Sequence, residues 1–130
     1  MRSDAREAAF KVVYSRLLGG DLAKGARTSL YNQAKLKEDE KVFAERLLAL
    51  VEERQEELTA VIAAQITRFA EYRIYTADKA ILLIALAEIK FFDDIPPVVS
   101  VSEAAALARK FSTEKSADFV NGVLGGIINE

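Results

Sequence analysis

The amino-terminal segment holds the residues of this chain whose type and spacing best suit binding chemistry. Arg2 and Arg6 are four residues apart, so they lie on one face of a helix, and Lys11, five residues further on, is expected close to that face. The free amide groups at the start of a helix add partial positive charge, and together with these side chains they would form a modest phosphate-binding site. The same cations would also suit a merely solubilising role, and at this point the sequence leaves both interpretations open.

The composition excludes several kinds of catalytic site. The chain has no cysteine and no histidine, which excludes a thiolate nucleophile, a serine–histidine triad and metal sites built on those ligands. The segment 20–25 has the glycine spacing of a phosphate-binding loop, but Ala26 and Arg27 stand where that motif needs Lys and Ser or Thr. We therefore predict that the protein is not an enzyme and holds no metal or cofactor.

Two clusters of carboxylates are better explained by structure than by chemistry. The glutamates within 52–57 could bind a hard cation, but at helical spacing they are typical of a solvated face. Asp93 and Asp94 precede two prolines, a pattern that favours a helix-ending turn over an acid/base pair.

Charge is distributed unevenly, although 18 Lys and Arg against 20 Asp and Glu give a net charge of only −2. Residues 1–27 hold six cations against three anions, whereas residues 38–57 hold three cations against eight anions. A basic end on an acidic body can approach a polyanion end-on. Ordinary scatter of charge over solvated helices is the simpler alternative.

Hydrophobic residues make up 51% of the 130 residues and recur with helical periodicity through nearly the whole chain. Asp4 followed by Glu7 resembles a capping box and predicts the start of the first helix, which Gly19 and Gly20 should end. About seven helices are expected, marked by apolar faces at Ala8, Ala9, Val12, Val13 and Leu17; Leu22, Ala26 and Leu30; Val42, Phe43, Leu47, Leu50 and Val51; Leu58, Val61, Ile62 and Ile66; Ile81, Leu82, Ile84, Ala85 and Ile89; Ala104, Ala105, Leu107 and Ala108; and Phe119, Val120, Val123, Leu124, Ile127 and Ile128. This pattern predicts an all-α fold in one domain, residues 1–130.

Three local features refine that prediction. The fifth of these segments is apolar almost all round, as expected of a central core helix. The polar stretch 52–57 predicts a bend between two helices, and Pro96 and Pro97 should stop the helix before them. The last helix contains three glycines, which predict either close backbone packing or fraying before the chain end: Gly122, Gly125 and Gly126.

No membrane-spanning segment is expected, because the longest apolar run, Ala80 to Ala87, is eight residues, whereas a span needs about 20. The start of the chain turns acidic at Asp4 and lacks the apolar stretch of a signal peptide. The chain is therefore predicted to be a soluble, cytoplasmic protein.

Four stretches, in order, carry patterns of a known family. They are Ala5-Arg6-Glu7 with Ala9 and Val13-Tyr14; Asp78-Lys79-Ala80-Ile81-Leu82 with Ala85 and Glu88-Ile89; Ile95-Pro96 with Val101-Ser102-Glu103-Ala104, Leu107-Ala108 and Lys110-Phe111; and Ser116 with Phe119-Val120-Asn121-Gly122-Val123-Leu124. In order and spacing, from about residue 4 to residue 128, they resemble the NusB family of bacterial transcription antitermination factors.

The resemblance implies both a fold and a function. NusB proteins consist of two helical subdomains built from seven helices. They bind the boxA element of nascent RNA, typically in ribosomal transcripts, as a heterodimer with NusE, a small-subunit ribosomal protein. With further factors the complex loads onto RNA polymerase and suppresses premature termination, and no covalent chemistry is involved.

By position, the resemblance assigns residues to two surfaces. Arg2 and Arg6 would contact phosphates from the first helix, with Lys11 beside them where the family often has glutamine. Phe119 would present a ring near the RNA path, with core packing as an equal alternative. The residues expected in or near the NusE-binding face are Tyr14, Asp78, Leu82 and Glu88, of which Leu82 is better explained as buried core.

Departures from the family pattern concern RNA affinity rather than fold. Ser3 and Asp4 interrupt what is usually a denser arginine cluster, and Leu83 stands where an arginine is common. Phosphate contacts supply most of the affinity for RNA, so these changes should weaken it. The alternatives are a protein-interaction module with weak or partner-dependent RNA binding, and a stand-alone relative of the RNA-binding domain of ribosomal RNA cytosine methyltransferases. The sequence also leaves a homodimer open.

Overall fold

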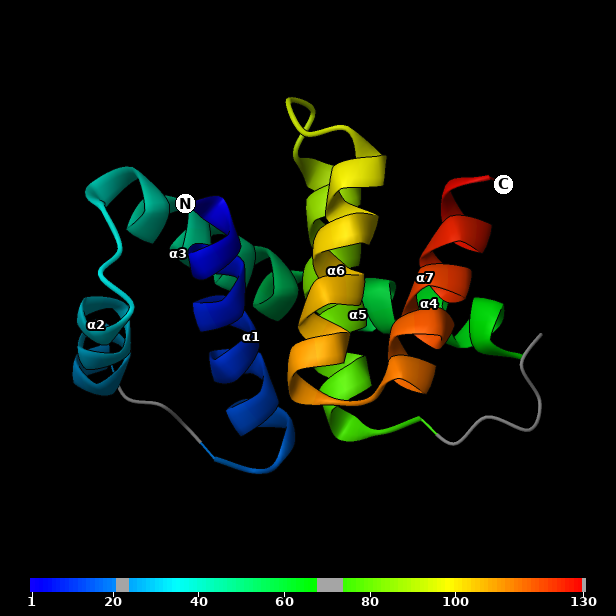
Figure 1. Cartoon of the computed structure of the whole chain (residues 1–130), viewed down its shortest axis with the longest axis horizontal. Helices are drawn as coiled ribbons and strands as arrows, with labels where there is room; N and C mark the ends of the chain where they lie inside the picture. Colours follow the sequence, from blue (N-terminus) through cyan, green and yellow to red (C-terminus); the bar gives the residue numbers. More distant parts are fainter. Residues whose placement is uncertain (21–23, 68–73, 130) are drawn as a thin grey trace.

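The computed structural model describes residues 1–20, 24–67 and 74–129 of the chain. Over these ranges the chain forms seven helices and no strand (Figure 1), which confirms the predicted all-α fold. None of the helices in these ranges is both long and apolar enough to cross a membrane. In chain order the helices are α1 (Arg2–Leu17), α2 (Lys24–Gln33), α3 (Glu38–Glu53), α4 (Gln55–Ile66), α5 (Thr76–Phe91), α6 (Pro97–Phe111) and α7 (Glu114–Ile128).

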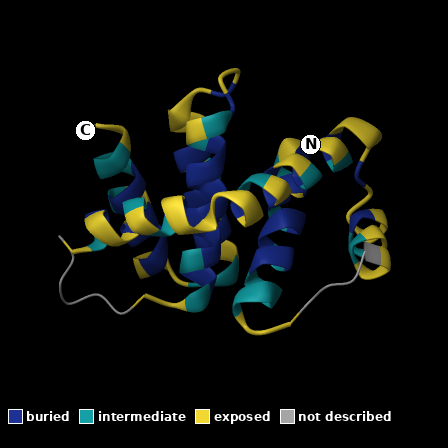
Figure 2. Ribbon diagram, turned by 180° about the vertical axis from the view of Figure 1, so that it is seen from behind, coloured by how far each residue is buried: buried dark blue, intermediate teal, exposed yellow. Residues whose placement is uncertain are grey.

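Helix α5 is the centre of the molecule. It packs against α1 and α3 from the first half of the chain and against α4, α6 and α7 from the second half. Every residue from Ala80 to Glu88 is buried, and Figure 2 shows this helix almost wholly in the buried class. The prediction of a core helix that is apolar almost all round is therefore confirmed. Helices α1–α3 and α4–α7 form two helical groups that share α5, as the predicted pair of subdomains requires.

Helix α1 begins earlier than predicted. It starts at Arg2, and Asp4 in its first turn accepts a hydrogen bond of 3.2 Å from the Met1 amino group. The predicted capping box of Asp4 and Glu7 is wrong, because Asp4 already lies inside the helix. In this first turn the helix dipole favours its negative charge. The predicted stop is confirmed, since Gly19 has a φ of 89°, a left-handed conformation that suits glycine.

Most other boundaries follow their local signals. Helices α3 and α4 are separated at Arg54, within the predicted bend. Helix α5 ends before the two prolines, and Pro97 opens α6 at a position where its missing N–H leaves no hydrogen bond unmade. Leu22, which was expected in the second helix, lies outside the described residues.

The glycines of α7 do not end it, because the helix continues to Ile128. A side-chain carbon built at Gly126 would overlap the amide of Gln65 on α4, whereas one built at Gly125 would meet only open space. Gln65 is itself buried, with 5% of its surface exposed. Close packing is therefore the correct one of the two interpretations at Gly126.

A buried ion pair joins α1, α5 and α6. Arg6 donates from Nε to Glu88 Oε2 (2.8 Å) and from Nη2 to Glu88 Oε1 (2.6 Å), and Ser100 Oγ donates to the same Oε1 (2.8 Å). The third guanidinium nitrogen, Nη1, lies 3.4 Å from Glu103 Oε1. Arg6 and Glu88 are 5% and 1% exposed, so each charge depends on the other for the solvation that water no longer provides.

A second buried polar contact joins α5 to α7. Ser116 Oγ donates to Asp78 Oδ2 (3.0 Å) and accepts hydrogen bonds from Ser112 Oγ (2.8 Å) and Thr113 Oγ1 (3.1 Å). Thr113 also caps α7 by accepting a hydrogen bond of 2.9 Å from the Ser116 amide. The start of α7 is thus fixed to the start of α5.

The environment of the two adjacent glycines predicts different effects of the same substitution. Gly125→Ala should stabilise the protein by about 0.5–1 kcal/mol, because alanine favours a helix interior and nothing obstructs it. Gly126→Ala should be clearly less stable than Gly125→Ala, because Gln65 must move. Urea denaturation of the two variants measures the difference, and equal free energies of unfolding would contradict the packing described.

Removing the buried arginine should be far more damaging than removing its exposed neighbour. Arg6→Met should cost about 3–5 kcal/mol of unfolding free energy, because it leaves Glu88 buried and unpaired. Arg2→Met is the matched control, because Arg2 forms an exposed ion pair with Asp94 and a cation–π contact with Phe43, each of a kind typically worth about 0–1 kcal/mol. The double variant Arg6→Met/Glu88→Leu should recover part of the loss. Urea unfolding in which Arg6→Met and Arg2→Met lose equal stability would show that the ion pair is unimportant.

Candidate nucleic-acid interface

Arg2 and Lys11 are the predicted phosphate contacts whose side chains reach the surface. The Arg2 side chain is 49% exposed, and its guanidinium lies 4.6 Å from the centroid of the Phe43 ring and 3.5 Å from Asp94. The Lys11 side chain is 42% exposed. Arg6 belongs to the same predicted face, but its side chain is only 6% exposed because it turns toward α5. The expectation that Lys11 lies close to this face is wrong, because in α1 it is about 140° around the helix from Arg6 and about 180° from Arg2. The three cations therefore do not reach the solvent together.

A second lysine lies beside Lys11. The Nζ atom of Lys110, at the end of α6, is 2.6 Å from Glu7 Oε1, while the Nζ atom of Lys11 is 3.5 Å from Glu7 Oε2. The two ammonium groups also lie 5.5 Å and 5.7 Å from the centroid of the Phe111 ring. Sequence reasoning assigned no role to Lys110, because the approach of α6 to α1 exists only in the folded chain. The feature of the sequence that could have pointed to Lys110 is its position next to an aromatic residue, Phe111, at the end of a predicted helix.

The start of α1 carries a further positive charge. The Met1 amino group forms ion pairs with Glu40 of α3 and with Asp4. The hydrogen bond to Glu40, followed by the one to Asp4, raises the pKa of this amino group above its ordinary value of 8.0. The same bond from the amino group lowers the pKa of the Glu40 carboxyl group. The amino group therefore stays protonated at neutral pH, next to Arg2.

Phe119 and three predicted partner-face residues are covered by the chain itself. Phe119 on α7 is 4% exposed, and Asp78, Leu82 and Glu88 on α5 are between 0% and 1% exposed. Asp78 and Glu88 are ten positions apart, about 15 Å along a helix, and each is held by a different polar network. Their contact roles stay predictions, and a direct contact would first require these side chains to leave their neighbours.

Tyr14 is the predicted partner-face residue that is not fully buried. Its ring stacks on Phe10 at a centroid distance of 5.6 Å, and the residue is half-buried. It lies on α1 one turn beyond Lys11, so a partner bound at Tyr14 would lie next to the lysines. The assignment of Tyr14 to a partner also stays a prediction.

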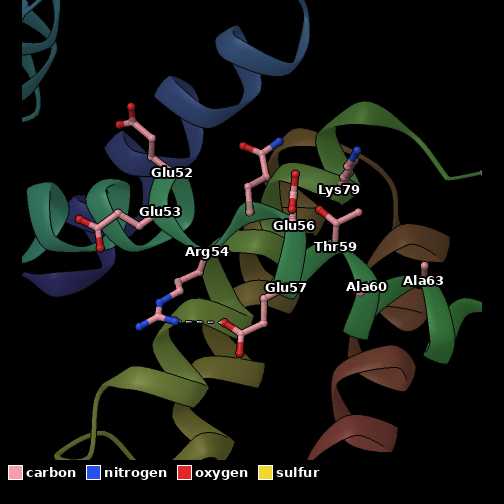
Figure 3. A pocket seen from close by; sticks show the side chains of 10 residues that line it. Glu52, Glu53, Arg54, Glu56, Glu57, Thr59, Ala60, Ala63 and Lys79 are labelled. Atoms are coloured by element: carbon pink, nitrogen blue, oxygen red, sulfur yellow. Dashed lines mark ion pairs between the residues drawn. The ribbon is translucent and has the colours of Figure 1, made fainter.

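The acidic cluster between α3 and α4 is unsuited to a polyanion. Its glutamates line an open groove together with Arg54 and Lys79, and their carboxylates diverge in Figure 3. Arg54 approaches one of them, Glu57, at 3.8 Å. The described residues include no group of three or more acidic side chains that could hold a metal ion. The excess of negative charge would repel RNA, so the candidate interface lies on α1 and α6.

Known proteins resemble this chain over nearly its whole length. The profile described as the NusB family matches residues 3–129. The transcription antitermination protein NusB of Natranaerobius thermophilus is 36% identical over 99% of this chain and 95% of that protein, and the protein of the same name from Clostridium botulinum (strain Loch Maree) is 33% identical over 98% of this chain and 99% of that protein.

The fold is also similar to that of a solved complex. A chain in the crystal structure of antitermination factors NusB and NusE with double-stranded RNA covers 98% of this chain and is itself covered to 96%, with 26% identity and a TM-score of 0.83. Sequence and fold thus agree over the same residues. The chain belongs to the NusB family.

Proposed function

We propose that the protein is a transcription antitermination factor that binds boxA-type single-stranded RNA of nascent ribosomal transcripts together with NusE. It would act in the cytoplasm, where the complex assembles on RNA polymerase. The observation that carries this proposal is the match of the whole chain to NusB proteins, one of which has been crystallised with NusE and RNA. The function consists of holding RNA and a partner, which requires no nucleophile, metal or cofactor.

Among the predicted RNA contacts, accessibility favours Arg2 and Lys11 for direct binding of phosphates. Both extend from α1 and are about half exposed. Arg2 is paired with Asp94, which is itself 65% exposed, and such pairs are weak enough to exchange with a phosphate. Arg6 and Phe119 would reach RNA only after a rearrangement, so their proposed role in the free protein is to position α1 and α7.

One observation favours the alternative of a protein-interaction module whose RNA binding depends on its partner. Arg6 is withdrawn into the core, and Lys11 and Arg2 each have an acidic neighbour. Fewer free cations mean fewer phosphate contacts and therefore lower affinity for RNA alone. NusE would then supply part of the binding surface.

The proposed function predicts selective RNA binding that NusE strengthens. At fixed salt, wild-type protein with NusE should bind a boxA RNA more tightly than a scrambled RNA of the same composition. Arg2→Gln should weaken binding to both RNAs and reduce the slope of log affinity against log salt by about 0.7, the value for one phosphate contact on a single strand. Fluorescence anisotropy over a salt series measures both quantities.

Arg54→Gln is the matched control, because Arg54 has similar exposure (54%) but lies in the acidic groove; it should bind RNA as wild type does. Selectivity that appears only with NusE would support the alternative. Equal affinity for the two RNAs with NusE present would show that the proposed function is wrong.

A further inference from the structure

One feature of the surface brings a residue with no predicted role, Lys110, next to the predicted phosphate contact Lys11 on a helix far away in sequence. Lys11 of α1 and Lys110 of α6 meet at Glu7, which is 103 positions from Lys110. We call Lys11 and Lys110 the lysine pair. The two helices run side by side at this point, as Figure 1 shows and as the contact of Phe10 with Phe111 confirms (centroids 5.0 Å apart).

The lysine pair has more positive charge than its neighbours neutralise. Two ammonium groups share one carboxylate, that of Glu7, so a net charge of about +1 remains at this point. The side chains are 42% and 61% exposed, so the charge faces solvent. The ring of Phe111 supports both cations through its electron-rich face.

Glu7 holds the lysine pair weakly enough for exchange. Ion pairs between exposed side chains typically contribute less than about 1 kcal/mol. An incoming phosphate can therefore take the place of the Glu7 carboxylate without a large cost. Glu103, the next acidic side chain of α6 toward α1, accepts a hydrogen bond from Ser3 Oγ (2.7 Å) and lies 3.4 Å from Arg6, which it shares with Glu88. Its negative charge is seven residues, about 10 Å along α6, from Lys110.

The lysine pair is a contact point separate from Arg2. Lys11 is nine residues from Arg2 on α1, which is about 14 Å along the helix and about 180° around it. Arg2 lies over Phe43 of α3, whereas Lys11 lies beside Phe111 at the end of α6. The capacity of the lysine pair to bind phosphate therefore depends on its own charge and exposure.

We propose that Lys11 and Lys110 together form a binding site for the phosphate backbone of single-stranded RNA, with Glu7 as the internal anion that RNA displaces. This inference rests on the proposed function for the identity of the ligand. It adds Lys110 to the RNA-binding surface and gives Glu7 an inhibitory role. Because the contact is to phosphate, it applies equally to boxA RNA and to a scrambled RNA.

The test compares Lys110→Gln, Glu7→Gln and the control Lys90→Gln, each with NusE and each with both RNAs over a salt series. Lys110→Gln should reduce the salt slope by about 0.7, which is a loss of about fivefold in affinity at 0.1 M salt. Glu7→Gln should raise affinity for both RNAs, since it removes a competing anion. Lys90 is 34% exposed and lies near Glu57 rather than α1, so Lys90→Gln should change neither quantity. Urea midpoints identify any variant that is merely unfolded.

Opposite effects of Lys110→Gln and Glu7→Gln distinguish binding from a structural role, in which loss of either partner would lower affinity alike. If Lys110→Gln binds RNA as Lys90→Gln does, or if it weakens only binding to NusE without RNA, the inference is wrong. If the wild type prefers boxA RNA but Lys110→Gln leaves RNA affinity unchanged, the inference is wrong and the proposed function stands. If the wild type shows no preference for boxA RNA but Lys110→Gln weakens RNA binding, the proposed function is wrong and the lysine pair still binds RNA.

Discussion

The buried ion pair of Arg6 and Glu88 is the constraint on which the rest of the structure depends. Two hydrogen bonds of 2.6 and 2.8 Å fix the rotation of α1 about its axis relative to α5, and Ser100 brings α6 to the same carboxylate. Because Arg6 faces inward, Glu7 and Lys11, about 100° and 140° further round the helix, face α6 and solvent. Arg2 is only about 40° from Arg6 and lies over Phe43 of α3. The buried Arg6 thus sets which side chains of α1 are exposed at the surface.

This arrangement divides the cations of α1 between structure and binding. An arginine suits the buried position because its planar fork satisfies both oxygens of a carboxylate. Two of the exposed cations each have an acidic neighbour: Asp94 lies beside Arg2 and Glu7 beside Lys11. At the proposed contacts RNA would have to compete with these internal anions, and a partner such as NusE would then matter for affinity in this chain.

Helical periodicity was sufficient to predict the fold, because each signal lies within a few residues of its effect. The all-apolar segment at the centre of α5, the stop at Gly19 and the break at Arg54 are all local. The candidate site was predicted less well, because it depends on contacts between distant residues. Arg6 and Glu88 are 82 positions apart and Glu7 and Lys110 are 103 apart, so spacing could not reveal that Arg6 is buried or that Lys110 joins Lys11.

The central claim is that RNA binds the exposed cations of α1 and of the end of α6 while Arg6 stays paired with Glu88. An NMR titration of the isotope-labelled chain, bound to NusE, with boxA RNA tests it most directly, because it follows the backbone amides and the Arg6 Nε–H group in one experiment. The predicted result is large shifts at Arg2, Lys11 and Lys110 with an Arg6 Nε–H signal that remains unshifted and slow to exchange. Release of that signal on RNA binding, or shifts centred on the acidic residues 52–57, would contradict the account.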